Sequence, residues 1–195
     1  MTNLSSVLFK YRSYTPIPFL IVMVFLENAN LWSLILGFVV VIIGELIRLW
    51  GVSWAGSETR TTGHMEGTYL IISGPFAYVR NPLYIGNILI YTGVGIMSYA
   101  LFPYLQIIAL LFFIFQYYYI IKGEEEFLQN KYGEQFTEYK KNVPRFFPRL
   151  LPYKAKNIKQ PQFKLKAGLK SERRTFQAIV FIMITIFLLW FIGRL

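Results

Sequence analysis

The chain has 195 residues, of which 55% are hydrophobic, and it carries 20 Lys and Arg against ten acidic residues, all Glu. Soluble domains contain about 45–50% apolar residues; here the excess lies in long blocks, which is typical of a membrane protein. With no Cys, no Asp and one His, the sequence excludes disulfides, cysteine nucleophiles, aspartyl-phosphate chemistry and multi-histidine metal cages. Any enzymatic chemistry must therefore use Glu, Arg, Lys, Tyr, backbone groups and at most one His.

The hydrophobic blocks predict an all-α integral membrane protein with five transmembrane helices. In chain order they run from about 15–27, 31–50, 82–97, 101–121 and 176–193. The first block opens with Pro16 and Pro18 and is short for a hydrocarbon core of about 30 Å. Two connections are short enough for tight helical hairpins, and two, at 51–81 and 122–175, are long and charged. We expect residues 1–195 to form a single membrane domain.

The basic residues predict the orientation of this domain. On the five-span arrangement 19 of the 20 Lys and Arg fall on one side, and only Arg194 falls on the other. By the positive-inside rule the N-terminus and both long connections are cytosolic, and the C-terminus is outside. The stretch 122–174 alone holds 14 Lys and Arg and six Glu, and such a segment is attracted to anionic lipid headgroups. Nucleic-acid binding is not expected, because no fold for it remains outside the spans.

A turn and a helix start occur together where a cytosolic connection enters the third span. Gly74-Pro75 is a turn signal, and Asn81-Pro82 is typical of a helix beginning. The free N–H groups of a helix N-terminus suit a carboxylate or phosphate, and Arg80 adds a cation at the same place. Gly86 would let a ligand or a neighbouring helix approach the backbone closely. An ordinary helix start with a snorkelling arginine would give the same pattern.

Two further segments could carry chemistry. Glu124, Glu125 and Glu126 directly follow the fourth span, and on a helix they point about 100° apart, so at most two face one site. Carboxylates there suit an ammonium or sulfonium cation, or else stabilise the dipole of a helix N-terminus. The basic and aromatic strip from Tyr139 to Pro148 returns toward the membrane surface, where it would otherwise serve as an interfacial anchor. Glu45 and Arg48, three residues apart, are expected to form a local pair.

The order of these segments resembles the isoprenylcysteine carboxyl methyltransferase family and the related membrane phospholipid methyltransferases. The resemblance covers about residues 69–148. Its motifs are Gly74 to Gly86, then Glu124 to Glu126, then Tyr132-Gly133-Glu134-Gln135-Phe136, then Tyr139 to Arg145. The family usually has His where this chain has Asn81, which leaves Asn81 or the solitary His64 to take its place.

The resemblance implies that S-adenosylmethionine binds in a pocket on the cytosolic side and leaves as S-adenosylhomocysteine. Catalytic roles are implied for Glu124, Arg80 and Arg145, and no metal is implied. The implied cofactor-binding residues are Tyr69, Leu70, Ile71, Gly74, Phe76, Arg80, Asn81, Pro82, Tyr84, Glu124 and Glu125. The physical chemistry agrees with this assignment, since a helix N-terminus suits the cofactor's carboxylate and Glu suits its ammonium group.

The methyl acceptor is expected to be lipophilic and to enter from the bilayer. A prenylcysteine-like carboxylate is ionised near pH 7, so its methylation needs positioning rather than a base, and Arg145 or Arg80 could hold it. The alternative is a phospholipid of the ethanolamine type, whose amine would need Glu124 or Glu125 as a base. A nicotinamide-dependent membrane reductase is less expected. A transporter is disfavoured because the chain shows no inverted repeat.

Overall fold

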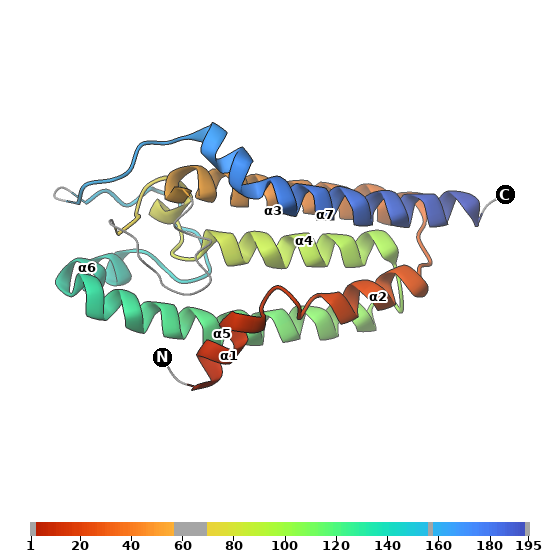
Figure 1. Ribbon diagram of the computed structural model, residues 1–195, viewed down its shortest axis with the longest axis horizontal. Helices are drawn as coiled ribbons and strands as arrows, with labels where there is room; N and C mark the ends of the chain where they lie inside the picture. The colour runs from red at the N-terminus through yellow and green to blue at the C-terminus, as the bar shows by residue number, and fades with distance from the viewer. Residues whose placement is uncertain (1–2, 57–69, 156–157, 194–195) are drawn as a thin grey trace.

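The computed structural model describes residues 3–56, 70–155 and 158–193, and all of their regular secondary structure is helical. Figure 1 shows the longer helices lying lengthwise beside one another in an elongated bundle. In chain order the elements are α1 (Asn3–Tyr11), α2 (Ile17–Phe25), α3 (Leu31–Ala55), the 3-10 turn η2 (Gly74–Ala77), α4 (Pro82–Ser98), α5 (Tyr104–Tyr132), α6 (Glu134–Asn142) and α7 (Leu165–Ile192). The all-α prediction is confirmed for this part of the chain.

Three helices are long and apolar enough to cross a bilayer, namely α3, α5 and α7, with 25, 29 and 28 residues. The apolar helix α4 has 17 residues. The helix α2 has nine, because it begins only after Pro16; at about 1.5 Å per residue it covers roughly half of a 30 Å core. Most of each predicted segment at 31–50, 101–121 and 176–193 lies within one of the three long helices, and the count of five spans stays a prediction.

Helices α3 and α4 pack so closely that backbone touches backbone. Gly37 on α3 faces Gly93 on α4, and Gly44 faces Gly86. The two glycines on each helix are seven residues apart. A Cβ atom placed on Gly44 would lie 2.8 Å from the carbonyl oxygen of Gly86, and one on Gly93 would lie 2.8 Å from that of Gly37. Small residues permit this approach in membrane helices. The close contact expected at Gly86 is therefore with a neighbouring helix.

Helix α5 continues well past the end of the predicted fourth span. The acidic triplet Glu124 to Glu126 lies inside it, and the helix stops only at Gly133, whose φ of +51° favours glycine. A triplet within a helix does not stabilise a helix N-terminus, so that alternative explanation for the three carboxylates is wrong. Helix α6 then follows directly, and its Phe136 and Tyr139 are buried.

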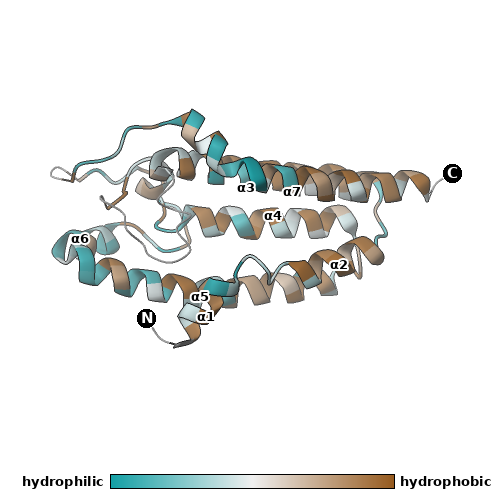
Figure 2. Ribbon diagram, viewed as in Figure 1, coloured by the Kyte–Doolittle hydropathy of each residue, from teal (hydrophilic) through white to brown (hydrophobic). Residues whose placement is uncertain are grey.

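Helix α7 begins at Leu165, eleven residues before the predicted fifth span. Its first turns pack against the end of α3: the Lys164 N–H donates to the carbonyl oxygen of Ser53 at 2.9 Å, and Gly168 lies directly against the Ser53 side chain. Figure 2 shows that hydrophilic residues gather on α6 and the beginning of α7, whereas the far half of α7 is hydrophobic. The bundle therefore has one polar end.

Helix α1 was not predicted, and it packs its inner face on α5. Leu8 and Phe9 contact an aromatic cluster that includes Phe113 and Tyr117 of α5. The outer face of α1 is apolar as well, since Leu4, Val7 and Tyr11 are exposed. Because apolar residues lie on both faces of α1, its sequence shows no clear amphipathic pattern from which the helix could be predicted.

Candidate functional site

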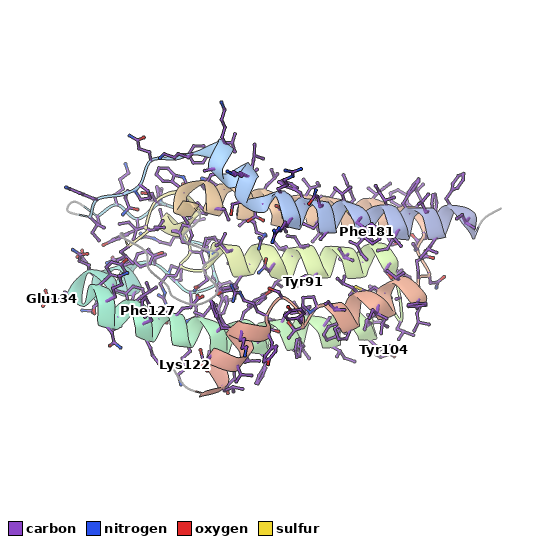
Figure 3. The ribbon with its side chains drawn as sticks, in the orientation of Figure 1. Tyr91, Tyr104, Lys122, Phe127, Glu134 and Phe181 are labelled. Atoms are coloured by element: carbon purple, nitrogen blue, oxygen red, sulfur yellow. The ribbon has the colours of Figure 1, made fainter. Side chains whose placement is uncertain are left out.

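The candidate site lies at the polar end of the bundle, where residues 70–82 lead into α4. Figure 3 places Glu134 and Phe127 toward this end of the molecule and Tyr104 toward the other. We call residues 70–82 the strip. The Gln160 side chain holds its beginning: Oε1 accepts from the N–H groups of Ile72 and Ser73 at 2.8 and 3.1 Å, and Nε2 donates to the Leu70 carbonyl oxygen at 2.9 Å. The Gln160 side-chain amide, which comes much later in the sequence, therefore supplies hydrogen-bond partners for the backbone of Leu70, Ile72 and Ser73.

The turn predicted at Gly74-Pro75 is confirmed. Gly74 has a φ of +63° and opens η2, and a Cβ there would collide with the Trp54 ring. The loop that follows α6 holds the next residues by backbone hydrogen bonds of 2.9 Å, from Tyr153 N–H to Ala77 and from Arg149 N–H to Tyr78. The strip therefore lies between the end of α3 and the 149–160 segment.

Glu125 is the centre of the site's charge network. Arg80 donates its Nε to Glu125 Oε1 at 3.0 Å, and Arg145 donates its Nη2 to Glu125 Oε2 at 2.5 Å. Glu125 is buried, at 6% exposure. Its hydrogen bond raises the pKa of Arg145, so the Arg145 guanidinium stays charged. The structure thus brings together three predicted site residues from α5, the start of α4 and the strip after α6.

Arg80 also lies with its Nη2 3.0 Å from Glu125 Oε1 and donates to backbone through its other groups. Its Nη1 donates to the carbonyl oxygens of Lys140 and Val143 at 2.9 and 2.5 Å, and its N–H donates to Pro144 at 2.9 Å. Arg80 is therefore fully used in joining α4 to the end of α6. Its predicted neighbour Asn81 does stand before α4, but its side chain does not cap the helix; instead its Nδ2 donates to the Arg145 carbonyl oxygen at 3.3 Å.

Tyr139 secures the other predicted wall residue, Phe76. The Tyr139 hydroxyl donates to the Phe76 carbonyl oxygen at 2.8 Å. Burial raises the pKa of Tyr139, so the hydroxyl stays protonated and keeps donating in the whole physiological pH range.

Glu124 points to a different partner from Glu125. The Tyr84 hydroxyl donates to Glu124 Oε1 at 2.5 Å, and the Tyr84 ring packs on Tyr117 with centroids 4.7 Å apart. Arg12, at the end of α1, is near enough for its charge to act on both Glu124 and Tyr84. Sequence reasoning missed Arg12, whose one signal was its place among the basic residues on the side predicted to be cytosolic.

A hollow of about 400 Å³ opens beside the strip. Of the predicted cofactor residues that the structure describes, Gly74 lines it, and Arg80, Asn81, Tyr84, Glu124 and Glu125 do not. Trp54, Tyr153 and Lys154 form its rim together with Gln160. The predicted wall residues Leu70 and Ile71 are buried and half-buried, whereas Tyr69 and His64 lie outside the described residues.

A second buried charge cluster joins α3, α4 and α7 deeper in the bundle. Arg48 lies 3.6 Å from Glu45, as predicted, but its closer carboxylate is Glu172 of α7, at 2.7 Å. Its Nη1 also donates to Asn87 of α4. Among the described residues, no group of three or more His, Cys, Asp or Glu side chains is arranged to hold a metal ion.

The profile of the phospholipid methyltransferase family matches residues 32–135, more than half of the chain. The chain belongs to this family. The matched region begins in α3 and ends at the first turn of α6, so the phospholipid methyltransferase match includes the strip, α4 and the acidic triplet, and excludes α1, Arg145, Gln160 and α7.

Three curated relatives are similar to part of this chain. The cobalt-zinc-cadmium resistance protein CzcN of Cupriavidus metallidurans is 33% identical over 64% of this chain and 53% of its own length. The nickel-cobalt-cadmium resistance protein NccN of Alcaligenes xylosoxydans xylosoxydans is 28% identical over 67% of this chain and 69% of its own. The protein-S-isoprenylcysteine O-methyltransferase of Xenopus laevis is 29% identical over 60% of this chain and 41% of its own. The chain thus matches about half of the length of CzcN, 69% of that of NccN and 41% of that of the Xenopus laevis protein. No solved structure gives a significant match.

Proposed function

We propose that the protein is a membrane methyltransferase that uses S-adenosylmethionine to methylate a lipid-linked acceptor, with a prenylcysteine-like carboxylate as the first candidate. Membership of the phospholipid methyltransferase family supports methyl transfer at a membrane. The observation that carries the cofactor assignment is the meeting of Glu124, Tyr84 and the start of α4 at the polar end of an apolar bundle.

The residues present fit the cofactor's charges. The first turn of α4 is not capped by the Asn81 side chain, so its N–H groups are suited to a carboxylate. Glu124 engages a neutral hydroxyl through one oxygen, and an ionised carboxylate has room for further donors such as an ammonium group. When bound, S-adenosylmethionine supplies a methyl group activated by a positively charged sulfur.

The chain's own residues then bind the cofactor, orient it relative to the acceptor and exclude water. Glu124 holds the cation, with Tyr84 fixing the carboxylate. Glu125 acts indirectly, since it holds Arg80 and Arg145 in place. Methylation of an ionised carboxylate releases no proton and so needs no base, whereas methylation of an ethanolamine-type amine would need Glu124 to accept one. This second acceptor is kept as the alternative.

We place the active site on the cytosolic face, with five crossings formed by α2, α3, α4, α5 and α7, the N-terminus inside and the C-terminus outside. The distribution of basic residues supports this orientation. The strip after α6 also supports a membrane surface at the polar end, because Phe147, Leu150 and Leu151 are 85, 97 and 73% exposed beside several Lys and Arg.

Calorimetry on the purified protein in nanodiscs tests the cofactor assignment. We expect one S-adenosylhomocysteine to bind per chain, and Glu124→Gln to weaken binding about tenfold, because one charge-assisted contact to the ammonium group is lost. Glu134→Gln, at an exposed position on α6, is the matched control and should bind like the wild type. Binding of NADPH in place of S-adenosylhomocysteine would overturn the methyltransferase assignment and favour the reductase.

The acceptor is identified by transfer of labelled methyl groups from S-adenosylmethionine into a membrane lipid extract. Base-labile label indicates a carboxyl ester, and base-stable label indicates an N-methylated amine. Base-stable label alone would replace the carboxylate acceptor by the ethanolamine-type alternative.

A further inference from the structure

Helix α1 brings a third guanidinium to the site. The Arg12 Nη1 donates to the carbonyl oxygen of Phe9 at 2.7 Å, and its guanidinium carbon lies 3.7 Å from the centre of the Phe9 ring. Phe9 packs on the same cluster of α5 side chains as Tyr84 does. The packing of α1 therefore fixes Arg12 beside the Tyr84 and Glu124 pair.

Arg12 differs from the other two arginines of the site in its partners. Arg80 and Arg145 are both bound to Glu125. Within the described part of the chain, Arg12 is held by a backbone carbonyl and a ring and forms no direct ion pair, although its charge attracts Glu124 at longer range. It is the site arginine whose charge is least engaged by a carboxylate.

We propose that Arg12 binds the anionic head of an amphiphilic acceptor and, together with Glu124 and Tyr84, forms the acceptor subsite of the enzyme. The ligand class is a carboxylate carried on an apolar tail. This inference rests on the proposed function, and it assigns the acceptor anion to Arg12 instead of Arg80 or Arg145.

The surroundings of Arg12 suit such a ligand. The outer face of α1 and the turn after it expose Val7, Tyr11 and Tyr14, at 47, 49 and 65%, so an apolar tail in the bilayer could lie along this face while its head reaches Arg12. The family profile begins only at residue 32. Arg12 therefore lies outside the region that the family profile matches.

The charges also predict an order of binding. In the structure Arg12 lies on the Phe9 ring, which packs on the same α5 cluster as Tyr84, the hydrogen-bond partner of Glu124. A cofactor ammonium group bound to Glu124 would neutralise that carboxylate and leave Arg12 to attract an anion more strongly. The two ligands should therefore bind with positive coupling.

The test measures binding of N-acetyl-S-farnesylcysteine and of its uncharged amide to the full chain in neutral-lipid nanodiscs, with and without S-adenosylhomocysteine. The wild type should prefer the carboxylate over the amide by about tenfold, with the preference larger when S-adenosylhomocysteine is bound. Arg12→Ala should abolish the preference, and Arg12→Lys should restore part of it, because Lys keeps the charge and loses the planar fork. Lys10→Ala, an exposed cation on the same helix, is the control and should keep it.

Two outcomes would overturn the proposal while leaving the methyltransferase assignment intact. One is a wild type that binds S-adenosylhomocysteine but shows no preference for the carboxylate. The other is an Arg12→Ala variant that keeps the full preference. Equal loss of S-adenosylhomocysteine binding and acceptor binding in Arg12→Ala would make Arg12 a structural residue and would also overturn the proposal. Failure of the wild type to bind S-adenosylhomocysteine would instead overturn the proposed function itself.

Discussion

Neighbouring acidic residues at the polar end have separate partners. Glu124 bonds a tyrosine hydroxyl, and Glu125 bonds two arginines. The helix separates them by about 100°, so adjacent residues of one type take different roles. Sequence reasoning found these residues through their motifs. It could not find the pairing of Arg80 and Arg145 on Glu125, because that pairing depends on a chain reversal between α5 and the strip after α6.

Glu125→Ala should reduce the stability of the protein strongly. It leaves two guanidinium groups facing each other without their shared carboxylate, and removing one partner of a buried ion pair costs roughly 3–5 kcal/mol. Thermal unfolding in detergent, monitored by the change in tryptophan fluorescence, measures this loss of stability. Glu134→Ala is the exposed control. A Glu125→Ala protein that melts at the wild-type temperature would show that the three residues do not hold the polar end together.

Helix ends were harder to predict than helix centres. Pro82 was expected to open α4 and does so, because proline fits a first turn. The ends of α5 and the beginning of α7 were misplaced, since both helices continue through charged residues where hydropathy falls. Charge ends the part of a helix that fits in lipid, and it does not end the helix.

The glycines between α3 and α4 give a sharp test at this scale. A Cβ on Gly93 would lie 2.7 Å from the Val41 backbone nitrogen and 2.8 Å from the Gly37 carbonyl oxygen. Backbone cannot move aside as a side chain can, so Gly93→Ala should part the two helices and lower the unfolding temperature by several degrees.

Gly95 is the matched control on the same helix. A Cβ there meets the terminal methyl group of Met23 at 3.1 Å and the Cγ atom of Gln106 at 3.3 Å, and these side-chain atoms need to shift by only a few tenths of an ångström. Gly95→Ala should therefore unfold close to the wild-type temperature, measured in the same detergent. Equal melting of both variants would contradict the close backbone contact between α3 and α4.

On the scale of the whole molecule, α7 is held mainly at its polar beginning. Only 11% of its most apolar window is buried, while Glu172 is fully buried against Arg48. The sequence predicted the local pair of Arg48 with Glu45 and missed Glu172, because residues 124 positions apart show no pattern that links them. This ion pair joins α7 to α3 at its polar beginning, and Ile179 and Ile186 pack into the apolar core farther along the helix.

Glu172→Ala should loosen α7 from α3. Spin labels on cysteines introduced at exposed Phe181 and Phe38 would report a broader distance distribution, and the absence of native Cys makes the labelling specific. Arg173→Ala, an exposed neighbour, should leave the distribution narrow. Replacing Arg48 by Met and both of its carboxylate partners, Glu45 and Glu172, by Leu should restore the narrow distribution, since the apolar triple variant removes all three buried charges; continued broadening in that triple variant would contradict this reason.

The Gln160 side chain and the 149–153 backbone complete the strip that precedes α4, although they follow it by about 75 residues. When α4 and α5 have just been synthesised, Gln160 and residues 149–153 have not yet been added to the chain. The donors and acceptors of Leu70 to Tyr78 must then be satisfied by water until the last segment emerges. The segment from Leu70 to Tyr78 therefore reaches its folded arrangement only after residues 149–160 have been synthesised.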